Sequence, residues 1–528
     1  MTARARGRVT GSLLVAGTAS DAGKSVLTAG ICRWLARRGV RVAPFKAQNM
    51  SNNSAVAPDG AEIGRAQAMQ AAAAGVPAEA AMNPVLLKPG SDMASHLVLM
   101  GKAAGEVSAA GYWSGDGGRA ALRGTVLAAY DDLRSRFDVV VCEGAGSPAE
   151  INLRRRDIVN MGLATARNLP VIVVGDIDRG GVFAALYGTL ALLGAADQAH
   201  VAGFVVNKFR GDASLLAPAL GRLRELTARP VLGVLPYLPG IWLDAEDAVT
   251  IERPSGIFPN GPCAPPQPPD HLRVVVIRLP RISNFTDLDA LALEPGVAVR
   301  FADSPAEVAD ADLAVLPGTR ATVADLRWLR GRGLDAALAR RAASGRAVLG
   351  ICGGYQLLGT AIHDGVESTS QVVAGLGLLP VTTRFAPDKT LGRPSGYAGG
   401  VPVSGYEIHH GAVSVTGGEP WFTSEPGGGG PRDGCRLGAV SGTLWHGVFE
   451  NDAFRQAYLS EVAAAAGRRF DPVPGTSFEA ARQAQFDVLA DAVERHLDTD
   501  ALLRLIEHGP PPGMPVLRAG PDKPGQKS

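Results

Sequence analysis

The chain has 528 residues, of which 46% are hydrophobic, enough for large buried cores and for at least two globular domains. Its 52 Lys and Arg balance 51 Asp and Glu, so the net charge of +1 gives no overall field that would draw it to nucleic acid or to an acidic membrane. Five scattered cysteines without C-x-x-C spacing argue against a disulfide framework or a structural zinc site and favour a reducing, cytoplasmic compartment.

Short apolar runs alternate with helical patterns through the first half, which is typical of an α/β fold with a parallel sheet. The first run, SLLVAG, is shorter than the ~7–15 residues of a signal-peptide core, so we predict a strand there. The sequence contains no run of about 18 apolar residues, so we expect no membrane-spanning helix. The expected strands are 12–17, 40–45, 137–144, 170–176, 201–207 and 230–236.

The stretch GTASDAGKS, from Gly17 to Ser25, lies between the first expected strand and the first expected helix, as a phosphate-binding loop does. Five residues, instead of the usual four, separate Gly17 from Gly23. In such a loop Lys24 would neutralise nucleotide phosphates, and Ser25 would offer its hydroxyl to Mg²⁺. A tight turn without a ligand is the alternative, which the Gly-Lys-Ser ending disfavours.

Polar segments follow four further strands, at the sheet edge where open α/β folds bind ligands. Lys46, Gln48 and Asn49 follow the second strand and are candidates for binding substrate. Glu143 ends another strand and is a candidate Mg²⁺ ligand. Any one segment could be an ordinary polar cap, but four at one edge indicate a site. The segments are PFKAQNMSNNS, CEGAGS, GDIDRGG and NKFRGD.

Composition divides the chain into a first domain at 10–250 that contains the phosphate-binding loop, a Pro- and Gly-rich linker at 251–271 and a second α/β domain at 272–500. We expect each domain to contain an open, mostly parallel sheet flanked by helices. The segment 478–498 is predicted to be an amphipathic helix that packs on the second domain. Residues 505–528 are predicted to be a disordered tail.

The stretch AVLGICGGYQLLG places Cys352 between a buried strand and a glycine-rich helix start. This is the pattern of a nucleophile elbow, in which a sharp turn lifts the thiol and the helix N-terminus favours the thiolate. GTLWHGVFE offers His446 as the base that a cysteine nucleophile needs. A buried structural cysteine with an unrelated histidine is the alternative, which the elbow disfavours.

The segment Gly350-Ile351-Cys352-Gly353-Gly354 with His446 resembles the class I glutamine amidotransferases. GTASDAGKS resembles the ATP-using domains of the dethiobiotin synthetase type, whose loop is longer by the same residue. The two in this order resemble the family of glutamine-hydrolysing adenosylcobyric acid synthases over roughly residues 10–460. The further motifs that carry this resemblance are PFKAQNMSNNS, MNPVLLKPGSD, EGAGSPAEINL, DIDRGG and NKFRGD.

The resemblance implies an amide ligase of cobalamin biosynthesis that uses ATP, Mg²⁺ and L-glutamine. Its corrinoid substrate would be adenosylcobyrinic acid a,c-diamide, whose b, d, e and g propionate carboxylates would be amidated through acyl phosphates. The residues implied are Thr18, Asp21, Gly23, Lys24, Ser25 and Asn207 for ATP, Ser25 and Glu143 for Mg²⁺, and Lys46, Gln48 and Asn49 for the substrate.

In the second domain, the resemblance implies that Cys352 attacks the glutamine amide and that His446 carries the proton. Backbone N–H groups near Gly318 and Gly353 would hold the oxyanion. Many class I members have a glutamate two residues after the histidine, where this chain has a valine. The prediction is therefore a Cys–His pair, with the nearest acid, Glu450, as an open candidate for a third member.

Two other functions remain open. A partition ATPase shares the lengthened loop but would need a basic patch or an amphipathic anchor, and the terminal tail offers neither convincingly. The related cobyrinic acid a,c-diamide synthase has the same two domain types, and only PFKAQNMSNNS and MNPVLLKPGSD favour the four-fold enzyme. The sequence does not indicate the order of the amidations, the corrinoid contacts, or whether the chain forms a homo-oligomer.

Overall fold

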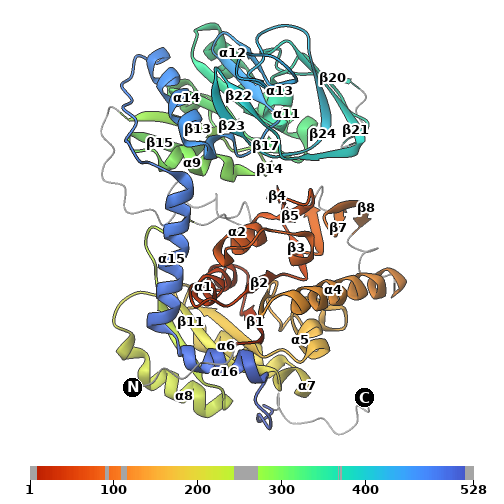
Figure 1. The fold of residues 1–528 in the computed structure, drawn as a ribbon, viewed down its shortest axis with the longest axis vertical. Coiled ribbons are helices and arrows are strands. Elements are labelled where there is room, and N and C mark those ends of the chain that lie inside the picture. Colours follow the sequence, from red (N-terminus) through yellow and green to blue (C-terminus); the bar gives the residue numbers. More distant parts are fainter. Residues whose placement is uncertain are drawn as a thin grey trace. The chain divides into compact units, whose positions relative to one another are not determined.

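The computed structural model describes residues 9–89, 94–108, 116–242, 271–366, 368 and 372–517 (Figure 1). The chain forms two compact units, each an α/β structure, which confirms the predicted fold class. Unit 1 comprises residues 1–50, 66–239 and 483–528, and unit 2 comprises 51–65 and 240–482. Among the described residues no helix is long and apolar enough to cross a membrane.

Unit 1 is built on a six-stranded parallel sheet in the order β12-β11-β10-β1-β9-β2, which confirms all six expected strands. The central strands are buried along their length, as expected for a parallel sheet covered by helices on both faces. The strands are β1 Gly11–Gly17, β2 Val42–Phe45, β9 Val139–Glu143, β10 Val171–Asp176, β11 Val201–Phe209 and β12 Val231–Pro236.

A smaller sheet, β3-β6-β7-β8, and a set of helices complete unit 1. Its strands are β3 Gln48–Met50, β6 Val85–Pro89, β7 Ala94–Leu99 and β8 Lys102–Ser108. The helices are α1 Lys24–Arg37, α2 Arg65–Ala74, η1 Ala80–Met82, α4 Asp116–Arg136, η2 Arg154–Arg156, α5 Met161–Arg167, α6 Val182–Leu192, α7 Ala195–Gln198, η3 Ala213–Leu216, α8 Ala217–Thr227, α15 Phe478–His496 and α16 Thr499–His508.

The C-terminal helix predicted at 478–498 is present as α15, but most of it packs on unit 1. Arg33 Nε in α1 donates to Asp487 Oδ1 at 2.8 Å, and Ala490 and Val493 join the apolar core beneath the parallel sheet. A Cβ on Gly30 would lie 3.1 Å from the Leu489 carbonyl oxygen, so the two helices approach closely there. The expectation that this helix packs on the second domain is therefore wrong from residue 483 onward.

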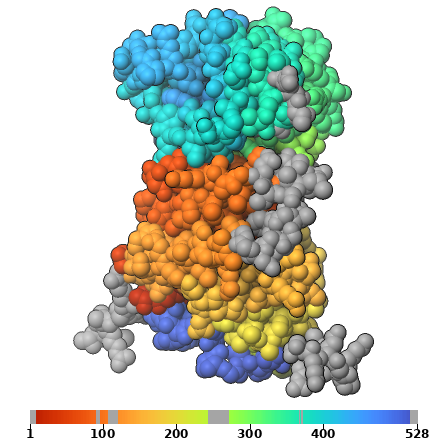
Figure 2. All heavy atoms as spheres, turned by 90° about the vertical axis from the view of Figure 1, so that its right-hand side faces the viewer, coloured from red at the N-terminus to blue at the C-terminus, as the bar shows by residue number. Residues whose placement is uncertain are grey.

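The segment predicted to be a disordered tail is ordered up to residue 517. Helix α16 extends to His508, and Gln198 exchanges two hydrogen bonds with the backbone of Leu517, at 2.7 and 2.9 Å. Figure 2 shows blue atoms of this C-terminal part of the chain beside yellow atoms of unit 1. Residues 518–528, and the predicted linker up to residue 270, lie outside the described residues.

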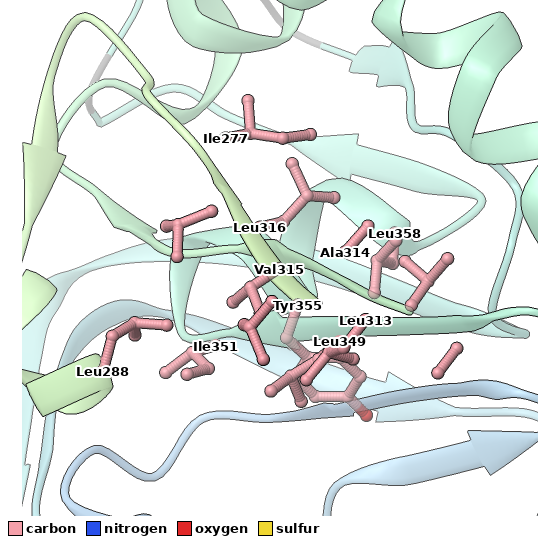
Figure 3. Packing of buried hydrophobic residues seen from close by; sticks show 14 of the residues in the cluster. Ile277, Leu288, Leu313, Ala314, Val315, Leu316, Leu349, Ile351, Tyr355 and Leu358 are labelled. Carbon is pink, nitrogen blue, oxygen red and sulfur yellow. The ribbon is translucent and has the colours of Figure 1, made fainter. Parts of the chain in front are cut away.

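Unit 2 is built on a second six-stranded sheet, in the order β15-β13-β16-β18-β28-β27, parallel except for the hairpin of β27 with β28. Figure 3 shows how Val315, Leu316, Leu349 and Ile351 from neighbouring strands pack with Tyr355 in its core. This packing fixes the end of β18, where Cys352 lies. The strands are β13 Leu272–Ile277, β15 Val297–Ala302, β16 Leu313–Leu316, β18 Ala347–Ile351, β27 Cys435–Leu437 and β28 Val440–Thr443.

Helices and four small antiparallel or mixed sheets surround this core. The helices are η5 Phe285–Leu288, α9 Asp289–Leu293, α10 Pro305–Asp310, α11 Thr322–Gly331, α12 Leu334–Ala343, α13 Gly353–Leu358, η6 Val448–Glu450 and α14 Asp452–Ala465. The strands are β4 Ser54–Val56, β5 Glu62–Gly64, β14 Ile282–Ser283, β17 Gly318–Thr319, β19 Ala361–His363, β20 Val372–Ala374, β21 Val381–Gly392, β22 Ser395–Ala398, β23 Val401–Ser404, β24 Glu407–Val415, β25 Phe422–Thr423 and β26 Arg432–Asp433.

Candidate active sites

The loop from Gly17 to Ser25 joins β1 to α1 in unit 1. Gly23 has φ 100°, and a Cβ there would lie 2.0 Å from Nδ2 of Asn207, so this position requires glycine. Asn207 in turn donates to the Ala22 carbonyl oxygen at 3.0 Å and supports the loop from β11. The first N–H groups of α1 have no partner within the helix, which makes this junction a site for an anion.

Lys24 folds over the same loop. Its Nζ donates to the carbonyl oxygens of Ala19 at 2.9 Å and Gly146 at 3.2 Å. An anion bound by the loop amides would lie beside this ammonium group. Two further predicted residues belong to the loop: Thr18 donates its N–H to the Val174 carbonyl oxygen at 2.9 Å, and Asp21 has φ 58°.

Glu143 at the end of β9 is fully buried, and three side chains donate to it. They are Ser25 Oγ at 2.7 Å, Lys46 Nζ at 3.1 Å and Gln70 Nε2 at 2.5 Å. Burial acts to raise its pKa, but the Lys46 ammonium and these hydrogen bonds hold the pKa below its usual value. Glu143 is therefore an ionised carboxylate. Gln70 was not predicted from the sequence, because α2 contains no motif that marks a residue of a site.

The carboxylate of Glu143 beside the hydroxyl of Ser25 is a donor set that suits Mg²⁺, which prefers oxygen ligands and keeps several waters. No cluster of three or more His, Cys, Asp or Glu that could hold a metal occurs in the described part of the chain. A cation here would therefore depend on water and nucleotide oxygens for its remaining ligands, as Mg²⁺ does in sites that also bind phosphate.

The structure separates the three predicted substrate residues. Lys46 joins the Glu143 cluster, whereas Asn49 is buried in the small sheet and donates to Gln67 Oε1 at 3.0 Å. Gln48 begins β3 and is half-buried. Of the three, Lys46 is the side chain that the structure brings to the phosphate loop.

In unit 2, Cys352 lies in a strained turn between β18 and α13. Its φ of 51° and ψ of −110° are unfavourable for a residue with a side chain, as in a nucleophile elbow. The next two glycines permit this turn, because a Cβ on Gly353 would lie 2.7 Å from Thr319 Cγ2 and one on Gly354 would lie 1.9 Å from the Leu316 carbonyl oxygen. The thiol is held at the start of a helix.

His446 is buried, and Cys352 lies near enough to act on its ionisation, while the Cys352 thiol donates to the Ile408 carbonyl oxygen at 3.8 Å. Its Nδ1 lies 2.6 Å from Asp287 Oδ2, while Asp287 Oδ1 accepts the Gly447 N–H at 2.8 Å. Burial acts to lower the pKa of His446, but the Asp287 carboxylate and Cys352 together raise it to about 10. A thiol, an imidazole and a carboxylate in this order suit nucleophilic catalysis.

The carboxylate on His446 is not the one considered from sequence. Glu450 Oε1 accepts from Arg65 Nη2 at 2.8 Å, whereas Asp287, in η5, faces the imidazole. Sequence reasoning missed Asp287 because NFTDLDAL has no glycine turn or strand end to mark it, and because it is 159 residues from His446.

The two predicted oxyanion positions lie next to Cys352 and His446. A Cβ on Gly318, in β17, would lie 3.2 Å from Cε1 of His446, so glycine leaves room for the imidazole. Gly353 begins α13 directly after Cys352, and its N–H has no partner within the helix. A backbone N–H beside a thiol nucleophile is the kind of donor that stabilises the oxyanion formed when the thiol attacks a carbonyl carbon.

Comparisons with known proteins cover both units. A family model described as the CobQ/CobB/MinD/ParA nucleotide binding domain matches residues 13–251, and one described as the CobB/CobQ-like glutamine amidotransferase domain matches 273–454. A protein of Streptomyces avermitilis named cobyric acid synthase is 62% identical over 512 residues, covering 97% of this chain and 99% of its own. Namesakes in Saccharopolyspora erythraea, 58% identical, and Nocardia farcinica, 57% identical, cover 96% and 97% of this chain and 97% and 99% of their own.

Solved structures are more distant. A glutamine amidotransferase crystal structure is 19% identical with a TM-score of 0.30, and covers 37% of this chain and 98% of its own. The PurLQS structure from Thermotoga maritima is 16% identical with a TM-score of 0.27, and covers 36% of this chain and 99% of its own.

Proposed function

This chain belongs to the cobyric acid synthase family, and we propose that it converts adenosylcobyrinic acid a,c-diamide into adenosylcobyric acid in cobalamin biosynthesis. It is an enzyme, a glutamine amidotransferase that acts as a ligase. The b, d, e and g propionate carboxylates would each become an amide at the expense of ATP and L-glutamine. The observation that carries this proposal is the presence, in one chain, of a phosphate loop with a buried carboxylate and a Cys352–His446–Asp287 array.

The ATP half of the reaction makes a carboxylate receptive to ammonia. A substrate carboxylate oxygen attacks the γ-phosphorus of ATP, the bond to the β-phosphate oxygen breaks, and ADP leaves. The loop amides with Thr18, Asp21 and Asn207 would bind the nucleotide, and Lys24 would neutralise its phosphates. Ammonia then attacks the acyl carbon, phosphate leaves, and a proton is released.

Ser25 and Glu143 would hold Mg²⁺, which would offset charge as the phosphoryl group moves. Lys46 would contact either the γ-phosphate or the incoming carboxylate, because its ammonium already lies at the same cluster, 3.1 Å from Glu143. Gln48 and Asn49 would also contact the substrate, because both lie on β3, two to three residues after Lys46.

The glutamine half releases ammonia. The Cys352 thiolate attacks the carboxamide carbon, and protonated His446 gives its proton to the departing ammonia. Water then hydrolyses the thioester to glutamate and frees the thiol. Backbone N–H groups at Gly318 and Gly353 would hold the oxyanion, each typically worth ~3 kcal/mol. We propose Asp287 as the third member in place of Glu450, because it orients the imidazole through Nδ1.

Counting new amides by mass spectrometry tests the assigned substrate. With ATP and glutamine, adenosylcobyrinic acid a,c-diamide is expected to gain four amides, and cobyrinic acid is expected to gain none at its a and c positions. Amidation confined to a and c would instead identify a cobyrinic acid a,c-diamide synthase. Turnover of neither corrinoid would contradict the ligase assignment.

Replacing Lys24 by alanine is expected to lower corrinoid amidation by about 10²- to 10³-fold with either glutamine or ammonium, since both nitrogen sources need the same activated carboxylate. The initial rate of amide formation measures this effect. Lys102→Ala, which removes an exposed lysine of the same unit, is the matched control and should keep the wild-type rate. Wild-type amidation by the Lys24→Ala enzyme would show that the loop does not serve the reaction.

A further inference from the structure

The hairpin formed by residues 51–65 belongs to unit 2, although the nucleotide-binding family model includes it in residues 13–251. It consists of β4 and β5, which pair antiparallel from Ser54↔Gly64 to Val56↔Glu62. The chain enters it from β3 and leaves it into α2, both of which belong largely to unit 1. The hairpin therefore belongs to the amidotransferase unit, although in the chain it lies between two segments of the ATP-using unit.

The first end of the hairpin holds the turn that carries Asp287. Asn284 donates its N–H to Asn53 Oδ1 at 2.8 Å, and its own Oδ1 accepts the Ser54 N–H at 3.0 Å. All three residues are buried. Asn284 adopts a left-handed conformation, with φ 49°, directly before η5, so this pair of bonds fixes the start of the turn in which Asp287 faces His446.

The other end of the hairpin reaches Tyr406, the residue that stacks on His446. The guanidinium of Arg65 lies over the ring of Tyr406, 5.8 Å from its centroid, and donates to Glu450 Oε1 at 2.8 Å. The Tyr406 ring stacks on the imidazole of His446, with centroids 5.2 Å apart and planes 22° from parallel. The backbones of Tyr406 and His446 also exchange two hydrogen bonds, at 3.0 and 2.8 Å.

The middle of the hairpin is anchored in unit 2 by apolar and charged contacts. Val56 packs with Tyr406 and Ile408 in a small buried cluster. Glu62 is fully buried and pairs with Lys389 Nζ at 2.5 Å. This pair joins the hairpin to β21, and removing either partner would leave the other charge buried without compensation.

We propose that the hairpin 51–65 positions the catalytic pair of Asp287 and His446, with Asn53 and Arg65 as its two positioning residues. Asn53 acts through Asn284 on the carboxylate, and Arg65 acts through Tyr406 on the imidazole. Neither touches glutamine in this assignment. The proposal rests on glutamine hydrolysis at Cys352, as assigned above.

The test is Arg65→Gln in the full chain. The kcat for glutamine-dependent amidation should fall by about 10- to 100-fold, because small displacements of a catalytic group are costly. The KM for glutamine should stay within about twofold, and amidation from ammonium should keep its wild-type rate. Arg65→Lys, which keeps a cation over Tyr406, should recover part of the loss. Arg469→Gln, at an exposed ion pair of the same unit, is the control.

Asn53→Ala provides a second, independent variant, and should show the same loss of kcat from the other end of the hairpin. Glutamine-dependent rates near wild type in both variants would overturn the proposal. A parallel loss with glutamine and ammonium would also overturn it, because that result indicates a general structural role. If Cys352→Ala retained glutamine-dependent amidation, the proposed function itself would fail, which separates the two outcomes.

Discussion

Replacing Cys352 by alanine is expected to abolish glutamine-dependent amide formation, by at least about 10⁴-fold, while amidation from ammonium continues. Glutamine gives up its nitrogen only after a nucleophile attacks the carboxamide, and in this site the thiol is the atom held beside His446. Ammonium supplies ammonia directly and needs only the activated carboxylate.

The measurement compares initial rates of corrinoid amidation with each nitrogen source. Cys435→Ala is the matched control, because it removes another buried thiol of the same unit, one that donates to the backbone carbonyl of Gly417 at 3.4 Å. This control should support both reactions. Unchanged use of glutamine by Cys352→Ala, or failure of ammonium to support a folded Cys352→Ala enzyme, would contradict the division of chemistry between the two units.

The sequence predicts those parts of this molecule whose signals are local. The six strands of the large parallel sheet in unit 1 are short, apolar and bounded by turn residues, so each can be recognised within a window of ten residues. Gly23 and Cys352 could be singled out for the same reason, since a strand, a glycine turn and a helix start adjoin one another in the chain.

Features that depend on distant contacts could not be predicted. The apolar side of α15 indicates that this helix packs against another element, but contacts in the structure, such as that of Arg33 with Asp487, are needed to show that the partner is α1. Gln70 donates to Glu143, which is 73 residues away in the chain, and the sequence of α2 gives no sign of this contact. The hairpin 51–65 has no local feature that assigns it to unit 2.

The choice between Glu450 and Asp287 shows the same limit at the active site. The sequence favours Glu450 because it is the acid nearest to His446 in the chain. In the structure its partner is Arg65, while a carboxylate 159 residues upstream of the histidine faces its Nδ1. Proximity in sequence is a poor guide to a side-chain pair when the elements that carry it come from different parts of a sheet.

Replacing Asp287 by asparagine is expected to lower glutamine-dependent kcat by about 10³- to 10⁴-fold, the size of effect found when an orienting aspartate becomes an amide. The amide keeps the volume but favours the wrong tautomer of His446. The Glu450→Gln variant separates the two candidates. Because it leaves Asp287 in place, it should lower glutamine-dependent kcat by less than about tenfold. A larger loss in Glu450→Gln than in Asp287→Asn would return Glu450 to the catalytic role.

The Asp287→Asn variant is also expected to change the pH dependence of glutamine hydrolysis. Burial acts to lower the pKa of His446, but Asp287 and Cys352 raise it to about 10, so the imidazolium that gives its proton to ammonia persists to high pH. Without the carboxylate this pKa falls, and the alkaline limit of glutamine hydrolysis should move to lower pH. The raised pKa of His446 also contributes to the free energy of unfolding. This contribution is fully present below about pH 6.5, the ordinary pKa of histidine, and is lost as pH rises through about 10. In Asp287→Asn that loss should be complete at a lower pH, and an unshifted alkaline limit would show that Asp287 does not act on the imidazole.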